Sequence, residues 1–209
     1  MTVGKPSLRE MKILAIELST ARGSLAWLDG EIEVARRWPN DRKNSGALFT
    51  NLDAVIKKFG APETIIVGLG PGSYAGTRIA ISAATGLQLS SCARLIGFPS
   101  ACAMECDAPE YCVIGDARRK SFFFARIREN ELVEDPTLFS EPDLKAKLDT
   151  LEPTMPVFSS GLLPQFDRVV VRYPSALVLA RVARKPQRGF HFPPLEPIYL
   201  REPHITMPR

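Results

Sequence analysis

The sequence predicts an α/β protein built from two related halves, and two observations support this. Short apolar runs rich in β-forming residues alternate with stretches of helical spacing along the 209 residues. In addition, ILAIELSTARGSLAWLDGEIEV and YCVIGDARRKSFFFARIRENELV share one order: an apolar strand ending near an acid, a polar turn with basic residues, and a second apolar strand. We therefore expect two α/β halves, at 11–97 and 98–209, after a disordered N-terminal extension at 1–10.

The first half is expected to open with an antiparallel meander. Residues 12–18 and 24–28 are predicted strands, and Asp29-Gly30 is a typical hairpin turn before a third strand, EIEVARRW. A helix is then predicted to follow an Asn44-Ser45 cap and to run to Phe59, because its leucines, valine and isoleucine fall at helical spacing. The remaining elements expected in this half are a buried strand at 63–70, a helix from Ser73 to about Ser91 and a strand at 94–97.

The second half is expected to repeat this pattern less regularly. PSACAMECDA at 99–108 predicts a helix, and the next segment predicts three strands. The further predicted elements are a short helix at 141–151, a strand in MPVFSSGL, an amphipathic helix at 174–185 and a proline-rich extended tail ending in a strand at Ile198–Leu200.

Composition excludes several classes of protein. No apolar run reaches the roughly 18–20 residues that a membrane span needs, and MTVGKPSLRE has no apolar signal segment, so we expect a cytoplasmic protein that starts at Met1 or Met11. The four cysteines form no C-x-x-C pair, so small buried side chains are expected rather than a disulfide or zinc site. The region 168–209 carries a net charge of +6, typical of a solvated tail or of a contact with RNA or an acidic partner.

The segment GLGPGSYAGTRIAISAATGL at 68–87 poses the main functional question. A glycine-rich turn before a helix can hold a phosphate, but no lysine follows as a Walker A motif requires. Gly70, Gly72 and Gly76 are also spaced one residue too widely for a dinucleotide fingerprint. Phosphate binding therefore stays open, with a purely structural loop as the alternative.

The helix behind this loop indicates a contact surface. Its only charge between Ser73 and Ala93 is Arg78, and its apolar and small residues point in several directions. A helix that is apolar all round must be covered on more than one side, so we expect a partner surface, with an internal core helix as the alternative.

Catalytic groups are scarce. Glu17 and Asp116 each end a predicted strand, where acids can place metal and nucleotide, although an acid at a strand end is more often structural. The only histidines, His191 and His204, lie near the end of the chain, so neither a Ser-His-Asp triad nor a histidine metal pair can be built.

Several motifs together resemble the TsaB (YeaZ) family. They are KILAIELST, GPGSYAGTRIA, LIGFPS, IGDARRKSFFFA and EPIYLRE, in that order over residues 11–202. The resemblance implies an actin-like (ASKHA, ribonuclease H-like) fold. It also implies a non-catalytic subunit that binds TsaD, with the ATPase TsaE joining them, for threonylcarbamoyl transfer to adenosine 37 of tRNAs reading ANN codons. It further implies a homodimer in isolation and tRNA contact only through the complex.

The resemblance places the TsaD interface on the helices at 45–59 and 73–90. The predicted contact residues are Leu48, Leu52, Ile56, Arg78, Ile79, Ala80, Ala83 and Leu87. Glu17, Ser19, Thr20 and Asp116 would form any residual nucleotide site, with ATP or ADP at a shared interface and no metal of its own. The family usually has Asp at position 17 and Phe-Thr where Tyr74-Ala75 stands, and these departures argue against that nucleotide site.

Two other functions remain open from the sequence. One is an actin-like ATPase or small-molecule kinase that uses Glu17 and Asp116, and the other is a stand-alone RNA-binding protein that uses the basic 168–209 region. A peptidase is disfavoured, because no nucleophile and base can be paired.

Overall fold

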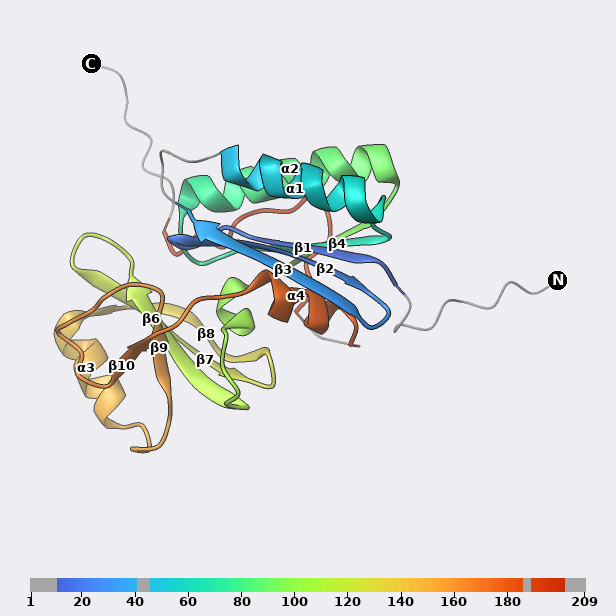
Figure 1. Cartoon of the computed structure of the whole chain (residues 1–209). Helices are drawn as coiled ribbons and strands as arrows, with labels where there is room; N and C mark the ends of the chain where they lie inside the picture. The colour runs from blue at the N-terminus through green and yellow to red at the C-terminus, as the bar shows by residue number, and fades with distance from the viewer. Residues whose placement is uncertain (1–10, 41–45, 186–188, 202–209) are drawn as a thin grey trace, which may run out of the picture.

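The computed structural model describes residues 11–40, 46–185 and 189–201, which form two five-stranded sheets with helices on their faces (Figure 1). The predicted N-terminal extension and the Asn44-Ser45 cap lie outside the described residues. The first sheet has the order β3-β2-β1-β4-β5. Its strands are β1 (Ile13–Glu17), β2 (Arg22–Asp29), β3 (Ile32–Pro39), β4 (Thr64–Gly68) and β5 (Arg94–Phe98).

The second sheet repeats the topology of the first. Its order is β10-β9-β6-β7-β8, and in both sheets three antiparallel strands are followed by two that run parallel to the first. Its strands are β6 (Glu110–Asp116), β7 (Ser121–Arg128), β8 (Glu131–Ser140), β9 (Val157–Ser159) and β10 (Val169–Val171). The predicted architecture of two related α/β halves is therefore confirmed, although β10 was not predicted.

Two helices cover one face of the first sheet, α1 (Gly46–Phe59) and α2 (Tyr74–Ser91) (Figure 1). The apolar spacing of α1 turns Leu48 and Val55 into the core, as periodicity predicts. Helix α2 begins where the Ser73 hydroxyl accepts the Gly76 N–H at 3.2 Å, and it ends at the left-handed Cys92. None of the helices in the described ranges is long and apolar enough to cross a membrane.

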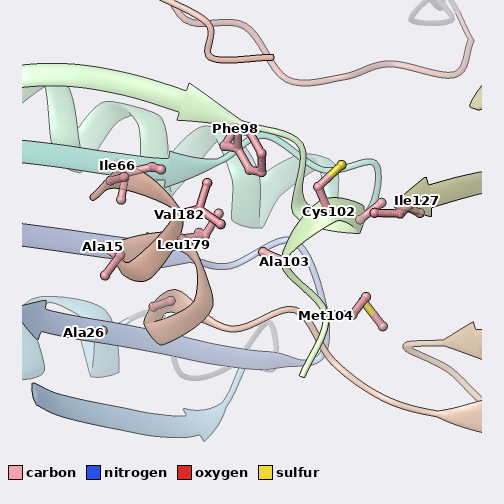
Figure 2. Close-up of a cluster of buried hydrophobic side chains, with 14 of the residues drawn as sticks. Ala15, Ala26, Ile66, Phe98, Cys102, Ala103, Met104, Ile127, Leu179 and Val182 are labelled. Carbon is pink, nitrogen blue, oxygen red and sulfur yellow. The ribbon is translucent and has the colours of Figure 1, made fainter. Parts of the chain in front are cut away.

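The opposite face of the first sheet is covered from the far end of the chain. Helix α4 (Ala176–Ala183) lies beneath β1, β2 and β4, whereas α3 (Glu141–Asp149) packs on the second sheet (Figure 1). Figure 2 shows Leu179 and Val182 of α4 beside Ala15 and Ile66 of the first sheet. The same apolar cluster continues through Cys102, Ala103 and Met104 to Ile127 of β7, so one core joins both halves.

Two predicted elements are wrong. The segment 99–108, expected as a helix, contains only a single 3₁₀ turn, η1 (Ser100–Ala103), whose residues are all buried. The chain becomes extended at Met104, which forms a β-bridge with Pro174, so the helix cannot continue. The strand expected at Ile198–Leu200 does not form either. There the Ile198 N–H donates to the Leu69 carbonyl at 2.8 Å, and the segment 189–201 is held by such isolated contacts, including the bridge between Gly97 and His191.

Candidate functional site

The glycine loop packs directly against the β1–β2 turn. The Ser73 N–H donates to the Ser19 carbonyl at 2.6 Å. A Cβ on Gly72 would lie 2.1 Å from that same oxygen, and a Cβ on Gly76 would lie 2.1 Å from the Leu18 oxygen. These glycines therefore allow a close backbone approach to the β1–β2 turn, which accounts for them without a bound phosphate.

Glu17 is enclosed beneath this loop. Its Oε1 accepts the Ser19 N–H at 2.6 Å, and its Oε2 accepts the Ser100 hydroxyl at 2.7 Å. The Ser100 oxygen in turn accepts the Gly70 N–H at 2.9 Å, so the carboxyl ties β1 to the loop and to η1. The side chain is fully buried, and this burial raises the pKa of Glu17 above its usual value.

A cleft of about 850 Å³ lies between the two halves. It is bounded by the β1–β2 turn, the loop before α2, the β6–β7 turn, residues 159–163 and residues 197–201. Of the four residues predicted for a nucleotide site, Ser19, Thr20 and Asp116 line this cleft and Glu17 does not. The Asp116 carboxylate accepts the Arg118 N–H at 2.6 Å. The described residues contain no group of three metal-ligating side chains.

Two tyrosines at the cleft were not singled out from the sequence. Tyr74 and Tyr199 line it, with ring centroids 5.3 Å apart. The Arg78 guanidinium lies 4.4 Å from the centre of the Tyr74 ring, and its Nε donates to the Tyr199 hydroxyl at 3.0 Å. Tyr74 and Tyr199 are distant in sequence, so only the fold could have revealed the pair. Arg78, a predicted partner contact, is therefore engaged within its own chain.

The predicted contact residues on α1 and α2 fall into two groups. Leu48 and Ala80 are wrong as contact residues, because both are buried in the core of the first half. The other apolar ones are partly buried and pack against that core: Leu52, Ile56, Ile79, Ala83 and Leu87. Among the exposed residues of these helices, we call one set the outer α1–α2 face: Phe49, Ala75, Arg78, Ser82, Thr85, Gly86 and Leu89. Helix α1 also exposes Asp53, Lys57 and Lys58.

The cysteines have no disulfide partner among the described residues. Cys102 and Cys112 are buried as expected, and burial raises the pKa of Cys102 to about 12 and that of Cys112 to about 11. Both thiols therefore stay protonated near neutral pH and are poor nucleophiles. Cys92 is exposed, contrary to the expectation of a buried side chain, because it caps the end of α2.

Two solved structures from Pseudomonas aeruginosa resemble this chain over most of its length. An uncharacterized protein with similarity to peptidase YeaZ matches with a TM-score of 0.73 and 19% identity, covering 91% of this chain and 100% of that one. YeaZ itself matches with a TM-score of 0.68 and 18% identity, covering 83% and 90%. No family model and no curated protein matches the sequence. The chain therefore has the fold of YeaZ, and its two sheets share the order expected of two related α/β halves.

Proposed function

We propose that this chain is a non-catalytic subunit of the TsaB (YeaZ) type. In this role it binds TsaD, with TsaE joining the complex, for threonylcarbamoyl transfer to adenosine 37 of tRNAs reading ANN codons. Two lines support the proposal: the YeaZ fold over most of the chain and the family-like motifs that occur in order along the sequence. The alternative function, an actin-like ATPase or small-molecule kinase that uses Glu17, is weakened because that carboxyl is enclosed away from the cleft.

The observation that carries the proposal is the character of the outer α1–α2 face. Its α2 part carries one charge, Arg78, and otherwise consists of small residues up to Leu89, whose side chain is 80% exposed. Gly86 has open space where a Cβ would stand, so the helix does not need this glycine for its own packing. A helix surface made mostly of small residues suits close packing against a second helix, and an exposed leucine beside it adds apolar area.

The same face accounts for the homodimer that we expect when TsaD is absent. A face of small residues that can pack against a helix of a similar protein can also pack against its own copy about a two-fold axis. Homodimerisation and TsaD binding should therefore compete, because both would cover Gly86 and Leu89.

The test is a pull-down with TsaD, together with the mass of the isolated chain in solution. Leu89→Glu and Gly86→Glu should each reduce TsaD capture and the dimer fraction at least tenfold, because each buries a charge in a helix contact. Val133→Glu is the matched control, since Val133 is 49% exposed, belongs to β8 of the second half and does not line the cleft. It should leave both assemblies intact.

Tolerance of both α2 substitutions would contradict the interface, provided that the variants unfold at the wild-type temperature. Loss of threonylcarbamoyladenosine from tRNA with the same variants, but not with Val133→Glu, would link the interface to the modification.

A further inference from the structure

We propose that the cleft between the halves binds single-stranded nucleic acid, with a base stacked on the Tyr74–Tyr199 pair and phosphates held by the basic β6–β7 turn. The inference does not rest on the TsaD interface, which lies on the outer α1–α2 face. Three features of the cleft support it: an open aromatic platform, a basic turn at its edge, and the lack of a cradle for a free nucleotide.

The platform is made by two tyrosines that remain open to solvent. Tyr74 is 48% exposed and Tyr199 is 37% exposed, and their rings are inclined by only 33°. Arg78 fixes the pair, since its guanidinium covers the Tyr74 ring and bonds the Tyr199 hydroxyl. Exposed aromatic rings beside an arginine are the usual stacking surface for unpaired bases.

A basic turn, β6–β7, lies at the edge of the cleft, with Arg118 in the lining and Arg119 and Lys120 following it along the chain. Arg118, Arg119 and Lys120 are consecutive, all exposed, and all left-handed, with φ of 65°, 52° and 59°. Left-handed backbone at residues other than glycine is uncommon and concentrates at functional sites. No carboxylate of a described residue forms an ion pair with these three side chains, so their charge is available to a ligand.

The charged groups that line the cleft are mostly positive. The lining carries two cations, Arg118 and Arg201, against a single acid, Asp116. An anionic ligand with hydrogen-bonding groups complements this surface better than a cationic or an apolar one.

A single-stranded nucleic acid fits this cleft better than a free nucleotide does. The loop before α2 packs its glycines against the Ser19 and Leu18 carbonyls and lacks the lysine of a triphosphate-binding loop. The platform offers a base only an exposed ring surface, so one nucleotide gains little. A nucleic-acid strand adds phosphate contacts with the β6–β7 turn to the stacking of its base. Several weak contacts on one ligand then add up to a higher affinity.

The test uses the full chain and a labelled single-stranded RNA of about 12 nucleotides, followed by fluorescence anisotropy at several salt concentrations. Affinity should fall as salt rises. Tyr199→Ala should weaken binding about tenfold, whereas Tyr199→Phe, which keeps the ring and loses only the bond to Arg78, should weaken it much less. Replacing Arg118, Arg119 and Lys120 together by Gln should make the logarithmic salt slope shallower by about 2.

A charge-matched variant controls for the loss of net charge. It carries Gln at Lys57, Lys58 and Lys145, which lie on α1 and α3 outside the cleft. The proposal is overturned if this control weakens binding as much as the β6–β7 variant, or if Tyr199→Ala leaves binding unchanged. It is also overturned if ATP displaces the RNA at equal concentration, because the ligand is then the free nucleotide. TsaD capture by Tyr199→Ala should stay normal, which separates a failure here from a failure of the scaffold function.

Discussion

Glu17 is a carboxyl that the fold uses while keeping it out of water. Ser19 and Ser100 donate to it, and no basic side chain is among the groups that shift its pKa. Asp116 ends the equivalent strand of the second half, yet it is exposed and lines the cleft. The sequence correctly placed both acids at strand ends. The sequence could not predict that Glu17 is buried and Asp116 exposed. Glu17 is covered by η1 and by the loop after β4, two segments that are remote from it in the sequence.

The buried carboxyl gives a pH prediction. The folded chain holds the Glu17 proton more tightly than the unfolded chain, whose pKa is near 4.5, so the stability that this group contributes is lost as the pH rises from 4.5 through the raised folded pKa. Glu17→Gln resembles the neutral acid, so near pH 4 we expect it to differ from the wild type by only about 1 kcal/mol. The variant should then gain stability relative to the wild type as the pH increases to 7.

Urea unfolding of both proteins across this pH range measures the difference. Contributions from other carboxyls, such as Glu33 and Glu105 with their lowered pKa values, cancel in the comparison. A difference that stays constant with pH would show that Glu17 is ionised as easily in the folded chain as in the unfolded one.

Among the elements, the regular ones were the predictable ones. Helical spacing predicts α1 and α2 within about one residue, because their apolar positions follow a regular period. The helix prediction for 99–108 is wrong because the small side chains there have no such period. The backbone of this segment is fixed instead by η1 and by the bridge between Met104 and Pro174. The same limit applies to the sites. The small-residue character of α2 was visible in the sequence, whereas the burial of Ala80 and the Tyr74–Tyr199 contact depend on how the elements pack.

Two glycines of α2 offer a matched comparison of these packing effects. Gly76→Ala should destabilise the chain by about 1–3 kcal/mol, because the added methyl meets the Leu18 carbonyl and pushes α2 off the β1–β2 turn. Gly86→Ala should stabilise it by roughly 1 kcal/mol, because the position is open and alanine favours a helix. Urea unfolding measures both, and equal effects of the two substitutions would contradict the close approach at Gly76.

At the scale of the molecule, α4 makes the two halves depend on each other. It leaves the second half at Ser175, packs under the first sheet, and shares its apolar cluster with η1 and β7. Arg22 and Arg37 of the first sheet both pair with Glu105, just after η1, which adds a polar connection at the same junction. Although the two sheets repeat one topology, we therefore expect a single cooperative unit.

Leu179→Ala tests this dependence. The side chain is fully buried, so its truncation should cost about 2–5 kcal/mol. Both halves should lose stability together. Trp27 and Trp38 report the first half by fluorescence, and amide exchange in β6 and β7 reports the second. Separate transitions, or protection lost only in the first half, would contradict the single unit.

The position of α4 also has a consequence for biosynthesis. Strand β5 closes the first sheet at Phe98, but the helix that covers its lower face begins only at Ala176. At about 5–20 residues per second, the ribosome needs roughly 4–16 seconds to supply the missing segment. During that interval the apolar face around Ala15, Ala26 and Ile66 lacks its own cover. The nascent chain should therefore be a chaperone client until its last helix has emerged.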